Sequence, residues 1–79
     1  MNNTEKYQEI FAKVFPDYEG PFDESFTFAS IEEWNSMTHL DLITKLEDAF
    51  DIMMDTNDIL HFGSYENGLK ILAKYGVEL

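Results

Sequence analysis

The chain has 79 residues and a formal charge of −11, from 16 acidic and five basic side chains. This length predicts one domain, spanning residues 1–79, and excludes folds that enclose a deep catalytic cleft. Hydrophobic residues make up 44% and aromatic residues 15%, which excludes a disordered acidic tail and predicts a folded core covered by negative charge. Nucleic acids and anionic membranes are bound through clustered Lys and Arg, so neither is expected as a partner. The expected partners are basic proteins.

The sequence contains no cysteine, which excludes a disulfide framework, a thiolate metal site and a cysteine nucleophile. The N-terminus lacks a basic run followed by an apolar stretch, so no signal peptide is predicted. No segment is apolar over a length that would cross a bilayer. We therefore expect a monomeric cytoplasmic protein without a membrane span.

A stripe of apolar residues near the N-terminus predicts the first helix, which Pro16 ends. The stripe recurs at helical spacing as Tyr7, Ile10, Phe11, Val14 and Phe15. From Asp17 to Trp34 the composition predicts a long loop with aromatic anchors, and residues 31–33 are compatible with one helical turn. The alternation of Phe26, Thr27 and Phe28 also fits a strand, but no second strand pattern exists to pair with it, so a loop is favoured.

The longest helix is predicted to open at Asn35, a good N-cap, and to run through Phe50. Its apolar stripe consists of Leu40, Ile43, Leu46, Ala49 and Phe50. Asp55 and Asp58 are expected to cap a short helix ended by Gly63. This short helix carries Ile59, Leu60 and Phe62.

Ser64 is expected to cap the last helix, which Gly76 ends. Its apolar stripe is Tyr65, Leu69, Leu72 and Ala73, and Gly68 inside it costs about 1 kcal/mol of helix propensity. The predicted fold is all-α: a small four-helix bundle with three longer helices, a short third helix and a long first loop.

Candidate catalytic residues are few. Ser36 and His39 are three residues apart on the longest helix, but Asp41 points away from His39, so a local Ser-His-Asp triad is excluded by geometry. His39 lies on the core side of the helix, where a partly buried histidine with satisfied hydrogen bonds is expected. His61 is expected at the surface.

Metal binding is also disfavoured. Asp55, Asn57 and Asp58 resemble the start of a calcium loop, but that motif requires an oxygen ligand and a glycine at the two positions that follow. Helix capping is the favoured role for these carboxylates. The Met53-Met54 pair is interpreted as core filling.

The outward face of the longest helix combines an exposed methionine with carboxylates. Thr44, Asp48 and Asp41 lie within about 40° of the direction of Met37, and Glu47 flanks them. A solvated acidic face is the simplest explanation of such a pattern. Ser36 lies in the first turn of the same helix, directly after the long loop, and this position favours a functional explanation of the acidic face.

Trp34-Asn35-Ser36-Met37, followed by Leu40, Leu42-Ile43, Leu46-Glu47-Asp48 and Phe50-Asp51-Ile52, resembles the acyl carrier protein family, whose mark is Asp-Ser-Leu at the start of the second helix. The resemblance covers nearly the whole chain, including the predicted helix lengths, the long first loop and the acidic charge. The tripeptide alone is a weak signal, but its setting in this hydrophobic spacing is specific. The resemblance implies that Ser36 is esterified with 4′-phosphopantetheine by a transferase that uses coenzyme A. Acyl or aminoacyl cargo would then be carried as a thioester between a loading ligase and downstream synthases or transferases with basic patches.

The resemblance further implies a docking surface and a pocket. The docking surface comprises Asn35, Met37, Asp41, Thr44, Glu47 and Asp48. Lys45 interrupts its charge. A surface pair with Asp41 or with the neighbours of Glu47 is the simplest interpretation, and an effect on partner choice is the alternative. Positions matching the family's acyl pocket are Met54, Ile59 and Phe62. Because Ile59 and Phe62 are bulky, small or polar cargo is favoured over a long fatty chain.

Asn35 departs from the family, which has aspartate before the serine. Either side chain caps a helix, but the aspartate also assists recognition by the transferase. Asn35 thus supports an alternative: a carrier-like interaction module that binds a basic partner and is never modified. A small hydrolase using Ser36 has no base to activate the hydroxyl.

Overall fold

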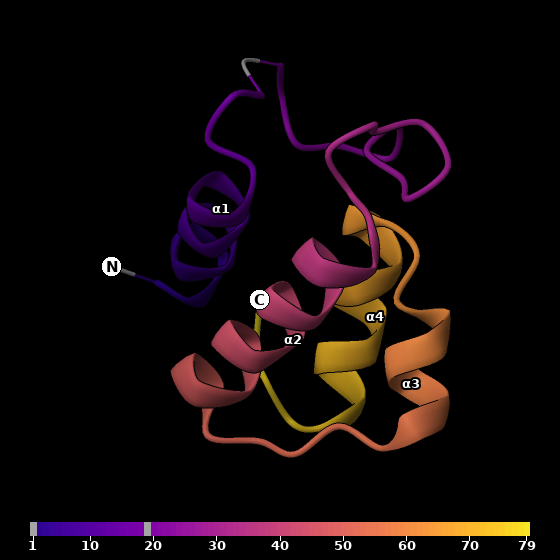
Figure 1. Cartoon of the computed structure of the whole chain (residues 1–79). Coiled ribbons are helices and arrows are strands. Elements are labelled where there is room, and N and C mark those ends of the chain that lie inside the picture. Colours follow the sequence, from indigo (N-terminus) through magenta and orange to yellow (C-terminus); the bar gives the residue numbers. More distant parts are fainter. Residues whose placement is uncertain (1, 19) are drawn as a thin grey trace.

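The computed structural model describes residues 2–18 and 20–79, which form four helices around one core (Figure 1). The helices are α1 (Asn3–Val14), α2 (Ser36–Phe50), α3 (Thr56–His61) and α4 (Tyr65–Lys74). The described part of the chain contains no strand, only an isolated antiparallel bridge between Thr27 and Ser64. The predicted small all-α fold, with three longer helices and a short third one, is confirmed.

A polar side chain caps the first turn of every helix. The caps are Asn2, Asn35, Asp55 and Ser64, of which the last three were predicted. Asn2 Oδ1 accepts a hydrogen bond from the backbone N–H of Glu5 at 2.8 Å, so α1 begins at Asn3, four residues before the predicted apolar stripe. The C-terminal end of α2 is capped by Asp51, whose backbone is in the left-handed conformation with a φ of 52°.

Aromatic side chains from α1, α4 and the long α1–α2 connection, together with Phe62 directly after α3, fill the core. Phe11 is fully buried at its centre, with the ring centroids of Tyr65 and Phe26 at 5.1 and 5.6 Å. Trp34, at the end of the connection, is 2% exposed. The aromatic anchors predicted in the connection thus reach the core at Phe26, whereas Phe22 packs against its edge and Phe28 remains 45% exposed.

Three apolar residues predicted in the core lie at the surface instead: Leu40, Met53 and Ala73. Leu40 is 60% exposed because the buried side of α2 is centred on Leu42 and Leu46, and Leu40 lies about 200° around the helix from Leu42. Leu60 is 73% exposed for the same reason, since it follows the buried Asp58 by two residues. Of the methionine pair, Met54 is buried as predicted, but Met53 is 85% exposed.

The long connection between α1 and α2 is a chain of turns, as predicted. It crosses the end of the molecule where α2 and α4 begin (Figure 1). Phe28 N–H donates to the carbonyl of Gly63 at 2.8 Å, and Tyr65 N–H donates to the carbonyl of Phe26 at 2.9 Å. At residues 31–33 the connection forms a single turn, which is closed by a hydrogen bond of 3.1 Å from Trp34 N–H to the carbonyl of Ile31.

Within the described ranges, no helix combines the length and apolar character needed to span a membrane.

Candidate functional site

Ser36 is the first residue of α2, and its side chain is exposed. Asn35 and Thr38, which lie on either side of it, form a capping box that fixes its position. Asn35 Oδ1 accepts hydrogen bonds from the N–H groups of Met37 and Thr38 at 2.9 and 3.1 Å. Thr38 Oγ1 accepts one from Asn35 N–H at 2.8 Å. The reciprocal partner Thr38 was not anticipated, because capping boxes more often use Glu or Gln at this position.

The start of α2 differs from the other helix starts in charge. Its first turn contains no acidic residue. The other three helices carry an acidic side chain there: Glu5 in α1, Asp58 in α3 and Glu66 in α4. The positive end of the α2 dipole is therefore not offset by a carboxylate in its own first turn.

A groove of about 450 Å³ adjoins Ser36 and is called the Ser36 groove below. It is lined by residues of the α1–α2 connection, α2, α3 and the α3–α4 connection: Phe28, Ser36, His39, Leu40, Ile59, Leu60 and Gly63. The two leucines and Phe28 account for much of its apolar wall, and all three are exposed side chains. The same exposure that places Leu40 and Leu60 outside the core therefore builds the groove.

His39 is half-buried in this groove, and both of its ring nitrogens are engaged. Trp34 Nε1–H donates to Nδ1 at 3.0 Å, and Nε2 lies 2.8 Å from the carbonyl oxygen of Ile59. These partners assign the proton to Nε2, because a carbonyl only accepts and Trp34 only donates. The expectation of a partly buried, satisfied histidine is confirmed. With Nδ1 occupied by Trp34, His39 offers no lone pair to activate Ser36.

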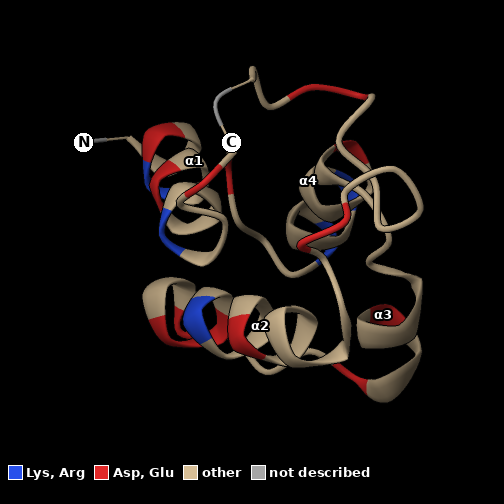
Figure 2. Cartoon of the chain, turned by 45° about the horizontal axis from the view of Figure 1, so that its top comes forward, with Lys and Arg blue, Asp and Glu red and all other residues tan. Residues whose placement is uncertain are grey.

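The predicted docking residues lie along α2, whose charges Figure 2 shows together with those of the neighbouring elements. Met37 is 82% exposed, and Asp41, Thr44 and Asp48 are also exposed. Lys45 Nζ lies 2.7 Å from Asp41 Oδ1, so Asp41 is the partner in the surface pair expected for Lys45.

Glu47 differs from the other predicted docking residues because it serves the fold. Its side chain is half-buried, and Oε2 accepts a hydrogen bond from the backbone N–H of Met54 at 2.9 Å. This bond closes the turn that leads from α2 towards α3. Asp48 is the exposed carboxylate on this stretch of α2.

The three predicted pocket residues are not brought together at Ser36. Ile59 lines the Ser36 groove, but Met54 and Phe62 are 4% and 0% exposed and belong to the core. The remaining apolar groove residues, Phe28, Leu40 and Leu60, were missed as site residues. Periodicity assigns leucines on a helix to the core, and no local pattern shows that Phe28 would reach the start of α2.

Asp58 forms a second polar cluster, between α3 and the end of α4. Its side chain is 7% exposed, and its carboxylate receives Lys74 Nζ at 2.6 Å and the Tyr75 hydroxyl at 2.5 Å. These two donors hold the pKa of Asp58 below its ordinary value. Tyr75 also accepts a hydrogen bond from Asp55 N–H at 2.9 Å, so the cluster joins the start of α3 to the end of α4.

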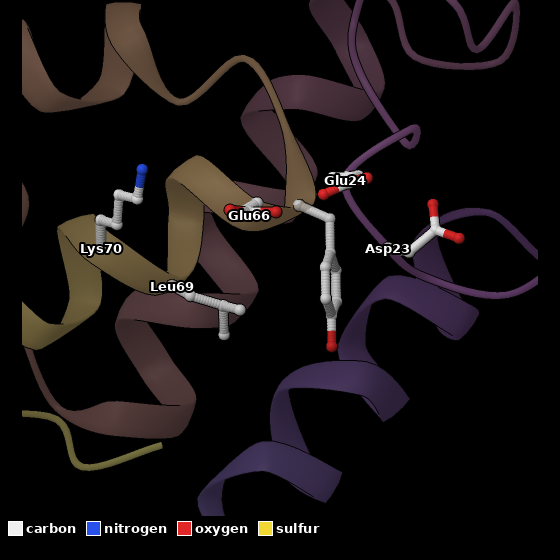
Figure 3. A pocket seen from close by; sticks show the side chains of 6 residues that line it. Asp23, Glu24, Glu66, Leu69 and Lys70 are labelled. Atoms are coloured by element: carbon white, nitrogen blue, oxygen red, sulfur yellow. The ribbon is translucent and has the colours of Figure 1, made fainter.

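A separate hollow of about 480 Å³ lies between the long connection and α4. Figure 3 shows Asp23 and Glu24 reaching it from the connection, and Glu66, Leu69 and Lys70 from α4. Asp23 accepts hydrogen bonds from the hydroxyl of Ser25 at 2.5 Å and from its N–H at 2.9 Å, which lower the pKa of Asp23 and stabilise a local turn.

Nowhere in residues 2–18 and 20–79 do three His, Asp or Glu side chains gather in an arrangement that would hold a metal ion.

Comparison with models of protein families gives no match, and searches of curated proteins and of solved structures find no similar protein. Function is therefore inferred from the Ser36 groove and the exposed face of α2.

Proposed function

We propose that the chain is a carrier protein of the acyl-carrier type, which receives 4′-phosphopantetheine on Ser36 and presents acyl or aminoacyl thioesters to biosynthetic enzymes. The supporting observation is the placement of Ser36: an exposed hydroxyl on the first residue of a capped 15-residue helix, at the edge of an apolar groove. Ser36 Oγ would displace adenosine 3′,5′-bisphosphate from coenzyme A, and its proton would pass to a base of the transferase. His39 is not available for this step, because its nitrogens are engaged.

The residues around Ser36 fit the proposed prosthetic group. A phosphodiester on Oγ would add negative charge at the positive end of the α2 dipole, where the first turn contains no carboxylate to repel it. When attached, the group supplies the thiol that carries cargo, which a chain without cysteine lacks. Apart from the Ser36 hydroxyl that forms the phosphodiester, the chain would contribute no reacting group. Its residues would hold the tether and present it.

The face of α2 that begins beside Ser36 supports docking to basic enzymes. Met37 supplies an almost fully exposed apolar contact directly after the attachment residue. Asp48, three turns further along, supplies an exposed carboxylate, and the net charge of −11 steers basic surfaces towards the molecule. Asp41 contributes less, since Lys45 already pairs with it.

Intact mass before and after incubation with coenzyme A and a broad-specificity phosphopantetheinyl transferase tests the proposal. We expect the wild type to gain one phosphopantetheinyl group and Ser36→Ala to gain none. Ser30→Ala is the control: it removes another exposed serine hydroxyl, one that hydrogen-bonds Thr27 and Ser25 within the α1–α2 connection, and it should still gain the group. A folded wild type that gains nothing with several transferases would contradict the carrier function and favour an unmodified module that binds a basic partner through the same face.

Asn35→Asp separates recognition by the transferase from helix capping. The capping hydrogen bonds use Oδ1, which aspartate also has, so the thermal midpoint should not change. A faster rate of modification would show that the asparagine limits recognition. An unchanged rate would place recognition elsewhere on α2.

A further inference from the structure

Three of the five basic residues of the chain lie along the line where α1 packs against α2. They are Lys6 and Lys13 on α1 and Lys45 on α2. Two adjoining hollows, of about 280 and 230 Å³, follow this line and share Ile10, Lys13 and Ala49. Figure 2 shows basic segments on both helices among the acidic ones. This surface, lined by the three lysines, Ile10 and Ala49, is called the lysine seam below.

The lysines of the seam differ in how firmly they are paired. Lys45 is held by the close ion pair described above. Lys13 Nζ lies 3.5 Å from Glu9 Oε1, and the two side chains are 63% and 45% exposed, so this pair is loose and weak. Lys6 Nζ lies 5.2 Å from the centre of the Phe50 ring and pairs with no carboxylate within residues 2–18 and 20–79. Lys13, which lines both hollows, therefore keeps its charge available to a partner.

The walls of the larger hollow define what fits it. Ile10 is buried and Ala49 is half-buried, so both offer apolar contact, while Lys13 and Lys45 bring ammonium groups from the two helices. A carboxylate side chain matches this arrangement, because its methylene groups contact the apolar wall and its oxygens accept from the ammonium groups. Asp48 lines the same hollow and repels a carboxylate, so it would face a cation instead. The complement of the seam is thus a surface of mixed charge.

The seam is continuous with the exposed face of α2. Lys45 and Asp48 line the hollow and also lie on α2, which begins at Ser36. Lys45 follows Ser36 by nine residues, or about 14 Å along the helix axis. A typical protein interface covers about 800 Å² on each partner, which corresponds to a patch roughly 30 Å across. An enzyme that acts on Ser36 can therefore cover the seam in the same encounter.

We propose that the transferase that modifies Ser36 places an aspartate or glutamate side chain in the lysine seam, against Lys13 and Lys45, while its basic residues face Asp48. This inference rests on the proposed carrier function. The alternation of charge would orient the enzyme, because an entirely basic surface shifted towards α1 meets repulsion from Lys13. The seam shares no residue with the Ser36 groove, so it acts on docking and not on the attached group.

Substitution of Lys13 tests the inference by the sign of its effect. Attraction by net charge alone predicts that an additional negative charge speeds capture by a basic enzyme. A carboxylate seated against Lys13 predicts the opposite. We expect kcat/KM for transfer from coenzyme A at low salt to fall about threefold in Lys13→Gln and about tenfold in Lys13→Glu, through KM with kcat little changed. Lys13→Arg keeps the charge and should stay close to the wild type.

Lys70→Gln and Lys70→Glu are the matched controls. Lys70 is exposed, lies on α4 outside the seam and follows Glu66 by four residues, as Lys13 follows Glu9. The same changes in net charge at this position should leave kcat/KM unchanged or raised. The thermal midpoint of each variant shows whether the helices remain folded at the assay temperature, and Lys13→Gln, which adds no like-charge pair with Glu9, serves if Lys13→Glu is destabilised.

Crosslinking with a water-soluble carbodiimide gives a direct readout of the contact. The reagent joins a lysine amine to a carboxyl group as an amide and takes up the water that is released. Mass spectrometry of the wild type mixed with the transferase should find Lys13 joined to an aspartate or glutamate of the enzyme. Lys13→Arg should lose this crosslink while keeping the rate of modification.

Three outcomes would overturn the inference, and they are distinguishable. If Lys13→Glu is modified as fast as Lys70→Glu, the seam does not contact the transferase, and the carrier function is unaffected. A crosslink from Lys13 to a second copy of this chain, in place of the enzyme, would assign the seam to self-association. Absence of any mass gain in the wild type would contradict the carrier function itself.

Discussion

Trp34 and His39 are joined by a hydrogen bond from Nε1–H to Nδ1 at 3.0 Å, and the planes of their rings differ by 28°. The bond links the end of the long connection to the second turn of α2. Through Nε2, His39 also bonds the carbonyl of Ile59, so one side chain connects the connection, α2 and α3. These three segments carry every lining residue of the Ser36 groove except Gly63, and His39 joins them by hydrogen bonds.

Replacing His39 by Leu is expected to destabilise the fold by about 1–3 kcal/mol, because the N–H of the buried Trp34 side chain loses its acceptor. Urea unfolding at pH 7 measures this cost. In a Trp34→Phe background the indole N–H is absent, so the same substitution should cost less. Equal costs in the two backgrounds would show that the hydrogen bond does not contribute to stability.

Asp58→Asn is expected to reduce the pH dependence of stability on the acid side. The Lys74 ammonium and the Tyr75 hydroxyl hold the pKa of Asp58 below its ordinary value of 3.8. A carboxylate with a lowered folded-state pKa stabilises the fold above its ordinary pKa and loses this effect as pH falls through the lower value. The thermal midpoint of Asp58→Asn should therefore be below that of the wild type at pH 7, and the gap should narrow below pH 3.8.

Tyr75→Phe provides an intermediate test of the same cluster. It removes one of the two donors and leaves the Lys74 contact in place. The difference in thermal midpoint between Tyr75→Phe and the wild type at pH 7 should be smaller than that for Asp58→Asn and should narrow over the same pH range. If the difference for Asp58→Asn stays constant from pH 7 to the acid limit, the charge of the carboxylate is not its cause.

Gly68→Ala should destabilise the protein although alanine is the better helix former. The gain in helix propensity is about 1 kcal/mol, but the added Cβ would overlap Tyr7 and Phe62, which are both fully buried. Overpacking of this kind costs more than the gain, so we expect a net loss of about 1–2 kcal/mol. Gly63→Ala, where the space is open, should change stability by less than about 0.5 kcal/mol. A raised thermal midpoint for Gly68→Ala would show that α4 can move away from α1.

Asp48→Lys is expected to lower kcat/KM for modification by the transferase about fivefold to tenfold at low salt, because it reverses an exposed charge on the docking face. The thermal midpoint should change little. Asp17→Lys makes the same change in net charge in the α1–α2 connection, and it should leave the rate close to that of the wild type. If both variants slow the reaction equally, net charge rather than the face of α2 controls docking.

Added salt should stabilise the fold at pH 7, since a net charge of −11 on a chain of this size is self-repelling. We expect the thermal midpoint to rise by several degrees between about 0.02 and 0.5 M sodium chloride. A variant with Glu32→Gln and Glu33→Gln, both exposed, should start from a higher midpoint and gain less from salt. A salt effect of equal size in both proteins would indicate a cause other than charge repulsion.

The sequence by itself determined the local structure of this protein. Periodicity identified the three longer helices, and the capping pattern of Asp55 and Asp58 identified the short one. Three of the four caps were evident because a capping side chain bonds backbone groups two or three residues away. The position of Ser36 at the start of the longest helix followed from Asn35 alone. The half-buried state of His39 also followed from its place on the helix.

Only the tertiary structure decided which apolar residues are buried and what surrounds Ser36. Leu40 fits the helical spacing of the predicted stripe but lies outside the buried side, since the direction of burial depends on where α1 packs against α2. The groove exists because the connection pairs with residues far along the chain, as at Thr27 and Ser64. Asp58 likewise finds its partner Lys74 sixteen residues away. Such contacts leave no local pattern, because each depends on the packing of all four helices, whereas caps and helical periods depend only on neighbouring residues.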